Sequence, residues 1–362
     1  MNTTDRMPKN YNISFLKLLA AIMVMAGHNA FITATNVPVL FGNGIHIIGV
    51  KILLTFSGYL ICKSWENEPE FFKYIIKRVF RLLPQLIVYL IFAAYIVGPF
   101  LTELPAIQYL TSRSTFLYVF YNAVLHINYS LPGIFETNPY PVAVNGSLWT
   151  LPIEFALYLC VPIGISLFGR FFKKKTLNII LAAVTFCVCA AQILNMSGLG
   201  ILPSRVVIYA TDWMQGLALA PYFLVGMCFS RMDFLKNNLN TGVGILFLLA
   251  IECFPINGLV KELILTFAIP YFCFSFAFEL PDILRGKSVK TDISYGIYLY
   301  GFFIQQTVTL LYIKLGWNIS ALCILIISIA VSAALAYISA RFIDRPIQKI
   351  KTRLLMKLNK AE

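Results

Sequence analysis

Two side chains near the amino terminus, Lys17 and His28, place a cation and a candidate general base in one long apolar run. A neutral imidazole can take up a proton near neutral pH, and an ammonium group can hold an anion. The residues are eleven positions apart, so a helix would place them on one face, roughly 16 Å apart along its axis. If the run crosses a membrane, both are functional candidates, because ionisable groups inside a span are costly.

The carboxylate of Glu154 is a second candidate for catalysis. It ends the stretch 145–154, which reads Asn-Gly-Ser-Leu-Trp-Thr-Leu-Pro-Ile-Glu and opens another apolar run. Glu154 and His28 each lie about two turns from the outer ends of their predicted helices, so we expect them at one depth. The carboxylate would then hold the imidazole tautomer and raise its basicity. The alternative is a structural His–Glu tie between two helices, and depth alone leaves the lateral distance open.

A basic amphipathic stretch precedes the third apolar run. Lys73, Lys77 and Arg81 fall four residues apart on one stripe of a helix, and Arg78 lies beside them. Because guanidinium groups bind phosphates bidentately, the stripe is a candidate anion site on the cytoplasmic side. The alternative is an anchor against acidic lipid headgroups, which the residues taken alone favour.

The composition indicates that a membrane protein carries these residues. Apolar residues make up 59% of the chain and charged residues 12%, about half of the charged content of a soluble domain. Ten apolar runs, most of them near the ~20 residues that a bilayer requires, predict an all-α, polytopic bundle of about ten transmembrane helices. The predicted spans are 12–34, 44–62, 75–98, 147–168, 177–195, 206–229, 241–256, 259–279, 292–313 and 319–342.

The positive charges predict how this bundle is oriented. Nearly all of the 29 Lys and Arg residues fall in the tails and in the loops of one side. This bias predicts that both termini are cytoplasmic. It also explains the net charge of +13, since no contiguous basic domain and no nucleic-acid motif is present. The exceptions are Lys51, within a span, and Arg113, Arg205, Lys261 and Lys314 on the other side.

The chain is predicted to form a single transmembrane domain over residues 1–362. Short cytoplasmic tails are expected at about 1–11 and 343–362, and one long external loop at about 99–146. The external loop is rich in Pro, Asn and Tyr, and it is either functional or an ordinary excursion outside the membrane.

Other reactive side chains give weaker signals. The eight cysteines form no Cys-x-x-Cys pair, and three scattered histidines give no metal-ligand spacing, so no metal is predicted. We interpret His46 and His126 as non-catalytic. Asp212 is either a second acid or a helix-packing partner.

Taken together, these residues resemble the acyltransferase-3 family of membrane O-acyltransferases, which modify bacterial surface glycans. The matches run in order through nearly the whole chain; each is weak alone, and the set is specific. They are Lys17 with His28, the Phe-Ser-Gly-Tyr-Leu of 56–60, Arg78 and Arg81 before Pro84, Ser147 to Glu154 followed by Tyr158, and the segments 222–226, 293–299 and 344–346.

The chain departs from the family pattern at two places. Lys17 stands where the family has Arg, which keeps the charge and loses the planar fork. The ninth helix often carries a histidine where Tyr300 and Gly301 stand here, so the resemblance supplies no second histidine. The hydrolase-like domain appended in some members is expected to be absent, because the chain ends soon after the last predicted span.

The resemblance implies transfer of an acyl group, most often acetyl, from acyl-coenzyme A to a hydroxyl of a cell-surface polysaccharide or its lipid-linked precursor. The enzyme would lie in the bacterial cytoplasmic (inner) membrane among its lipids. His28 would be the general base, or a transient acyl carrier, and Glu154 would orient it. The remaining implied site residues are Lys17, Lys77, Arg78 and Arg81 for the coenzyme, and Asn145, Ser147, Trp149 and Tyr158 on the acceptor side.

Three alternatives stay open at this point. A transporter or flippase for a glycan or a small organic anion would also place polar residues within ten helices, although inverted repeats are not evident. An enzyme acting on a cytoplasmic sugar precursor would use the same residues with an acceptor entering from inside. A non-catalytic partner in a glycan-assembly complex would tolerate the loss of His28. The residues give no support for a homo-oligomer and no evidence against one.

Overall fold

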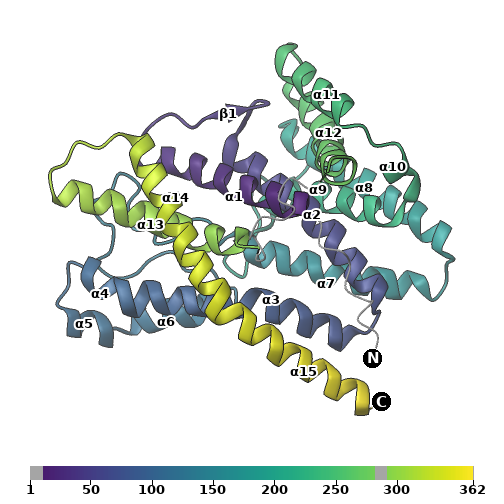
Figure 1. The fold of residues 1–362 in the computed structure, drawn as a ribbon. Coiled ribbons are helices and arrows are strands. Elements are labelled where there is room, and N and C mark those ends of the chain that lie inside the picture. The colour runs from purple at the N-terminus through teal and green to yellow at the C-terminus, as the bar shows by residue number, and fades with distance from the viewer. Residues whose placement is uncertain (1–10, 282–291, 362) are drawn as a thin grey trace.

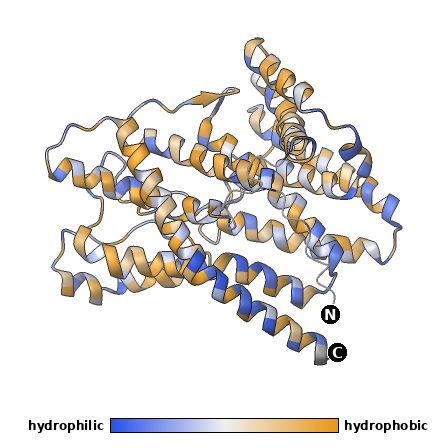
Figure 2. Cartoon of the chain, viewed as in Figure 1, coloured by the Kyte–Doolittle hydropathy of each residue, from blue (hydrophilic) through white to orange (hydrophobic). Residues whose placement is uncertain are grey.

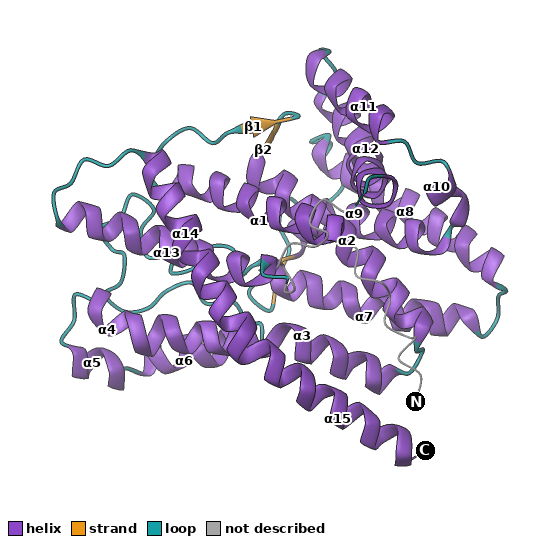
Figure 3. Cartoon of the chain, in the orientation of Figure 1, coloured by secondary structure: helices purple, strands orange, loops and turns teal. Residues whose placement is uncertain are grey.

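The computed structural model of the chain describes residues 11–281 and 292–361, and nearly all of their regular structure is helical (Figure 3). This confirms the predicted all-α fold class. The elements are α1 (Tyr11–Ile32), β1 (Val39–Leu40), β2 (Asn43–Gly44), α2 (Ile45–Asn67), α3 (Phe71–Ile91), the π-helix η2 (Phe92–Val97), α4 (Gly98–Leu101), α5 (Ala106–Thr111), α6 (Arg113–Ala123), α7 (Thr150–Gly169), α8 (Lys174–Met196), β3 (Val207–Ile208), β4 (Thr211–Asp212), α9 (Trp213–Arg231), α10 (Asp233–Asn237), α11 (Thr241–Cys253), α12 (Gly258–Glu279), α13 (Ser294–Lys314), α14 (Ala321–Ser339), the π-helix η3 (Ala340–Asp344) and α15 (Arg345–Ala361).

Nine helices within the described residues are long and apolar enough to cross a membrane, so the chain is a multi-pass membrane protein. The prediction of a tenth span at 241–256 differs from the structure, where only the 13-residue helix α11 forms. Thirteen residues rise about 20 Å, which is less than the ~30 Å of a hydrocarbon core. Apolar side chains cover most of α11 and α14 (Figure 2), as expected for helices that face lipid. The cytoplasmic location of the termini stays a prediction, and the first tail lies outside the described residues up to residue 10.

The segment predicted as an external loop at 99–146 is folded. It contains most of α4 and all of α5 and α6, which lie together at one end of the molecule (Figure 1). The buried hydroxyl of Tyr109 donates to the carbonyl of Ala94 in η2 at 2.8 Å, and Asn138 donates to the carbonyl of Gln306 in α13 at 3.0 Å. These bonds attach the segment to η2 and α13, since buried backbone groups require partners.

Glycines bring α2 and α9 into backbone contact. A Cβ on Gly58 would lie 1.9 Å from the carbonyl oxygen of Phe223, and a Cβ on Gly226 would lie 2.1 Å from that of Thr55. No larger residue fits at either place without separating the helices, which is the usual role of small residues in membrane helix packing. The close approach explains the two family-like segments 56–60 and 222–226, and it fixes the face of α2 that carries Ser57.

A buried ion pair joins α2 to α12 away from that face. The ammonium group of Lys51 lies 2.7 Å from Glu262, and both side chains are almost fully buried. Glu262 also accepts from Tyr222 at 2.9 Å and from Gln192 at 3.1 Å, while Lys51 donates to Asn43 at 3.1 Å. Because its charges are balanced and hydrogen-bonded, this network ties four helices and the β1–β2 hairpin together.

Candidate active site

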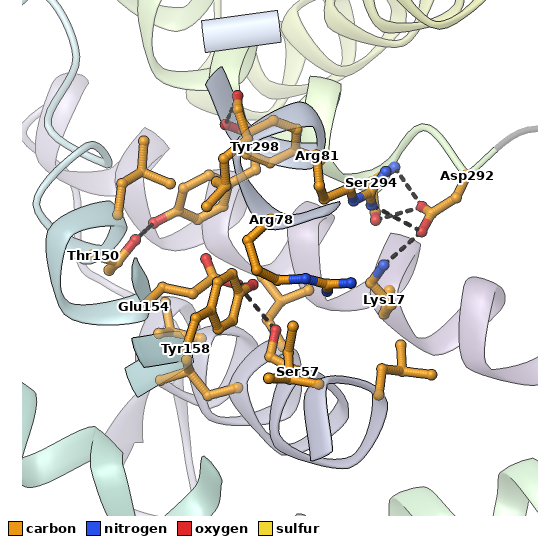
Figure 4. Close-up of a pocket in the computed structure, with 18 residues that line it drawn as sticks. Lys17, Ser57, Arg78, Arg81, Thr150, Glu154, Tyr158, Asp292, Ser294 and Tyr298 are labelled. Carbon is orange, nitrogen blue, oxygen red and sulfur yellow. Dashed lines mark hydrogen bonds and ion pairs between the residues drawn. The ribbon is translucent and has the colours of Figure 1, made fainter. Parts of the chain in front are cut away.

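A cavity of about 290 Å³ lies between α1, α2, α3, α7 and α13. Figure 4 shows the polar side chains that converge on it from these helices and from the segment just before α13. Half of the site residues predicted from the sequence line this cavity, and these are Lys17, Arg78, Arg81, Glu154 and Tyr158.

One end of the cavity is an ion cluster centred on Asp292. The carboxylate lies 2.5 Å from the ammonium group of Lys17 and 3.5 Å from the guanidinium group of Arg81. It also accepts from the backbone N–H of Ser294 at 3.0 Å and from its hydroxyl at 2.6 Å. Burial alone would raise the pKa of Asp292, but Lys17, Arg81 and the bonds from Ser294 hold this pKa well below its ordinary value. The carboxylate of Asp292 is therefore ionised, and it pairs with two of the three cations in the cavity that were predicted to bind an anion.

Arg78 is the third of these cations and is engaged differently. Its guanidinium group donates to the Ser64 hydroxyl at 3.1 Å and lies over the ring of Tyr74, 5.5 Å from the centroid. The buried Nε has no hydrogen-bond partner, and no carboxylate of the described residues forms an ion pair with Arg78. A buried donor without a partner is costly, so this group is suited to an anion that enters the cavity.

Lys77 was predicted to belong to the same anion site, but it does not line the cavity. Its ammonium group pairs with Glu68 in the turn between α2 and α3. The basic stripe predicted from the sequence therefore does not form one site. Arg81 lines the cavity, whereas Lys77, one helical turn earlier, contacts the connection between α2 and α3.

Glu154 lies inside the cavity on α7. Its carboxylate accepts hydrogen bonds from the hydroxyl groups of Ser57, at 3.0 Å, and Tyr158, one turn further along α7. Ser57 was noted in the sequence only as part of the 56–60 segment, and its place here follows from the rotation of α2 against α9. Glu154 and Arg78 line the same cavity without forming an ion pair within 4 Å (Figure 4).

The polar groups of the turn before α7 are hydrogen-bonded to other groups of the protein. Asn145 donates to the carbonyl of Leu299 at 2.8 Å and accepts from both the backbone N–H and the hydroxyl of Ser147. The hydroxyl of Tyr298, in turn, donates to the carbonyl of Ser147 at 2.8 Å. Asn145 and Ser147 are fully buried, and Trp149 packs against the main apolar core. Asn145 and Ser147, two of the four residues predicted on the acceptor side, thus fix the start of α7 against α13.

His28 lies beyond the other end of the cavity. Its ring is 5.2 Å from that of Phe302, centroid to centroid. Phe302 follows the cavity residue Tyr298 by four positions, about one turn or ~6 Å along α13, and His28 itself does not line the cavity. Within the described residues His28 makes no hydrogen bond to Glu154, and the pairing expected from their equal depth is not formed. Ser57 and Tyr158 donate hydrogen bonds to the carboxylate of Glu154 instead. The first helix is rotated so that His28 faces α2 and α13.

His46, interpreted from the sequence as non-catalytic, is the neighbour of His28 that the sequence did not reveal. The two ring centroids are 5.7 Å apart. A Cβ on either Gly27 or Gly44 would come within 2.6 Å of the His46 side chain, so these glycines make room for its ring. The pair could not be predicted from the spacing of the two histidines in the sequence. They lie on different helices, and the β1–β2 hairpin between these helices determines where α2 begins.

The remaining candidates lie elsewhere. The ring of His126 packs between Tyr121 and Tyr209, at 5.0 Å from each, in the external segment. Asp212 caps α9 by accepting from the backbone N–H of Met214 at 3.1 Å, which favours its structural interpretation. In the part of the chain that the structure describes, no three His, Cys, Asp or Glu residues gather as metal ligands do.

Comparison with known proteins places this geometry in a family. The sequence model described as "Acyltransferase domain" matches residues 10–340. The chain is 26% identical to a protein named "O-acetyl transferase" of Shigella phage Sf6, over 81% of this chain and 84% of the relative. It is 25% identical to "Nodulation protein 10" of Rhizobium leguminosarum bv. viciae, over 95% of both chains. It is 26% identical to "Peptidoglycan O-acetyltransferase OatA" of Listeria monocytogenes, over 96% of this chain and 58% of the relative. No solved structure matches the chain.

The family match spans nearly all of the membrane helices and both ends of the cavity. It favours an enzyme over the transporter that the helix count alone allowed. The matched region includes the two-ended site, with cations at one end and a histidine pair beyond the other. The chain therefore belongs to the acyltransferase-3 family and is a multi-pass membrane O-acyltransferase.

Proposed function

We propose that this chain transfers an acyl group, with acetyl expected, from cytoplasmic acyl-coenzyme A to a hydroxyl of a cell-surface polysaccharide or its lipid-linked precursor. One observation carries the proposal: a single cavity is lined by Arg78, Arg81 and Lys17 and by Tyr298, which lies one helical turn along α13 from Phe302, the ring that His28 contacts. Such a site suits a donor with an anionic head and a reactive end far from it.

The cationic end would hold the phosphates of the donor. Arg78 offers a buried donor without a partner, and Arg81 is still 38% exposed beside Asp292. Arginine forks bind phosphate bidentately, whereas Lys17 would contribute charge without the fork. The acyl arm would then extend along α2 and α7, past Ser57 and Glu154, over roughly the 16 Å that separates Lys17 from His28 on α1.

The reaction would occur at the histidine end. His28, as general base, would take the proton of the acceptor hydroxyl while the oxygen attacks the thioester carbonyl. The resulting tetrahedral intermediate would collapse with cleavage of the carbon–sulfur bond. Coenzyme A would leave with the proton that His28 had accepted, and His28 would return to its neutral state. In a variant of this scheme, His28 carries the acyl group before transfer.

The names of relatives support the acetyl donor and the glycan acceptor. Two relatives are named as O-acetyl transferases, and the name of the Listeria protein specifies peptidoglycan. The predicted topology places the cationic end at the cytoplasm, where acyl-coenzyme A is made, and the histidine end towards the outside. We therefore propose the bacterial cytoplasmic membrane as the location and an outward-facing sugar as the acceptor.

The test is the ester content of the surface glycan of the host. Base-labile O-acyl groups are measured in a gene deletion and after complementation with wild type, His28→Ala or His126→Ala at equal membrane abundance. His126→Ala is the matched control, since it removes an imidazole from the external segment. We expect ester to be restored by wild type and His126→Ala but not by His28→Ala. Restoration by His28→Ala would refute the mechanism, and unchanged ester on deletion would refute the proposed acceptor.

A further inference from the structure

The carboxyl-terminal helix α15 lies outside the part of the chain that the family model matches. That match ends at residue 340, and α15 covers Arg345–Ala361. The helix continues from α14 through η3 and packs against α3, the helix that carries Arg78 and Arg81 (Figure 1). A helix that lies beyond the matched residues 10–340 is therefore packed against the helix that carries two cations of the site.

One lysine of α15, Lys351, lies on the face of the helix that packs against the rest of the protein. The half-buried positions recur every three or four residues and are mostly apolar, as in Ile347, Leu354 and Leu358. Lys351 shares this half-buried stripe, whereas Lys349 is exposed on another face. A basic helix that only anchors to lipid headgroups would keep its lysines on the exposed face, so the position of Lys351 requires another explanation.

The surroundings of Lys351 are cationic. It lies within electrostatic range of Lys77, Arg78 and Arg81, and its hydrogen bond goes to Gln348 on its own helix. Like charges at short range repel one another, and partial burial strengthens the repulsion.

The carboxylates near this cluster are committed elsewhere. Glu68 pairs with Lys77, Asp292 pairs with Arg81 and Lys17, and Asp344 accepts from Gln85. Within the described residues neither Arg78 nor Lys351 has a carboxylate within ion-pair distance. The protein thus gathers two cations from different helices without an ion pair to either, and Glu154, the carboxylate that shares the cavity with Arg78, accepts from Ser57 and Tyr158.

We infer that α15 and α3 together form a phosphate-binding surface, where Lys351 and Arg78 bind one ligand together. Phosphate matches this surface because it carries more than one charge and can accept from a lysine and an arginine at once. The phosphate can come from acyl-coenzyme A, in which case the inference rests on the proposed function, or from the headgroup of an acidic lipid. The chemistry is the same, and the experiment separates the sources.

The experiment uses the full chain in nanodiscs of phosphatidylcholine, with or without phosphatidylglycerol. Lys351→Gln removes the charge, Lys351→Arg keeps it, and Lys349→Gln is the matched control on the exposed face. Two quantities are measured for each protein: the Kd for coenzyme A in phosphatidylcholine, and the binding of fluorescent phosphatidylglycerol.

If coenzyme A is the source, we expect Lys351→Gln to raise its Kd roughly tenfold, the usual effect of losing one charge-assisted bond. Lys351→Arg and Lys349→Gln would keep the wild-type value. If lipid is the source, Lys351→Gln would lose phosphatidylglycerol binding and leave the Kd unchanged. The inference is overturned if Lys351→Gln matches Lys349→Gln in both measurements. A wild type that binds no coenzyme A would refute the proposed donor, and the lipid measurement would still decide the role of Lys351.

Discussion

His28 and His46 lie with their ring centroids 5.7 Å apart and their planes tilted by 39°, although they belong to different helices. The Nδ1 atom of His46 is buried without a hydrogen-bond partner in the described part of the chain. Its ring is held by the two glycines beneath it and by Phe31, whose ring lies 5.3 Å away. The family-like histidine on α1 is therefore one of a pair, and the second member comes from the start of α2.

We predict that His46→Phe lowers kcat roughly tenfold, within the range of a partial acid–base contribution, and leaves the KM for acyl-coenzyme A unchanged. Phenylalanine keeps a ring in the space beside Gly27 and removes both nitrogens, so packing is retained while proton exchange with His28 is lost. Steady-state release of coenzyme A by purified protein measures both constants.

A comparison of His46→Phe with His46→Ala separates a chemical role of His46 from a packing role. If His46→Phe retains the wild-type kcat and His46→Ala does not, His46 only fills space beside His28. A raised KM for the acyl donor in His46→Phe would also contradict the prediction, because His46 lies beyond the opposite end of the cavity from the cations.

Arg78→Lys should raise the KM for acyl-coenzyme A roughly tenfold with little change in kcat. Lysine preserves the charge, but it lacks the buried Nε and the fork that can hold a phosphate. The control is Arg170→Lys, the same change at an exposed position at the end of α7. Equal KM values for the two variants would show that Arg78 is no more than a fixed charge.

Three of the four cations that the sequence assigned to the coenzyme line one cavity, whereas Lys77 does not. Lys17, Arg78 and Arg81 line one cavity, as expected, because helical periodicity and the positive-inside bias fix both the face and the depth of each residue. The sequence did not predict the partners of Glu154 or of His28. Depth follows from the position along a helix, whereas lateral contact depends on how each helix is rotated, which the backbone contact of Gly58 with α9 decides.

The sequence did not reveal the short helices within 99–146 or the shortness of α11 for another reason. Residues 99–146 lack a long apolar run, so their short helices give no period that stands out, and their order depends on bonds such as that from Tyr109 to η2. The run at 241–256 is apolar enough for a span, but its helix ends at Cys253 before it is long enough.

Gly226→Ala should lower the stability of the folded protein by about 1–3 kcal/mol, the usual cost of overpacking, or prevent folding. The added Cβ would lie 2.1 Å from a backbone oxygen of α2, and a backbone atom cannot turn aside as a side chain can. Gly164→Ala is the matched control, since a Cβ there meets nothing within 4 Å. Thermal unfolding in detergent, followed by size-exclusion chromatography, measures the difference. Equal melting temperatures for the two variants would contradict the close packing of α2 and α9.

Asp292→Asn should tighten the binding of coenzyme A while lowering the stability of the ligand-free protein. The carboxylate pairs with Lys17 and Arg81, so its removal leaves two cations close together without their shared counter-charge. An anionic ligand then restores the balance and no longer competes with the carboxylate. The stabilisation that a ligand gives grows with the logarithm of its concentration divided by Kd, so the tighter binding by itself predicts a larger upward shift.

Thermal unfolding with and without coenzyme A tests this prediction. Asp292→Asn should melt below wild type without the ligand and show a larger upward shift with it. The lowered pKa of Asp292 means that its contribution to stability is fully present above the ordinary carboxyl pKa and is lost only as the pH falls through the lowered value. Wild type should therefore keep the smaller shift throughout the neutral range. A smaller shift in Asp292→Asn than in wild type would show instead that the carboxylate orients Lys17 and Arg81 for the ligand.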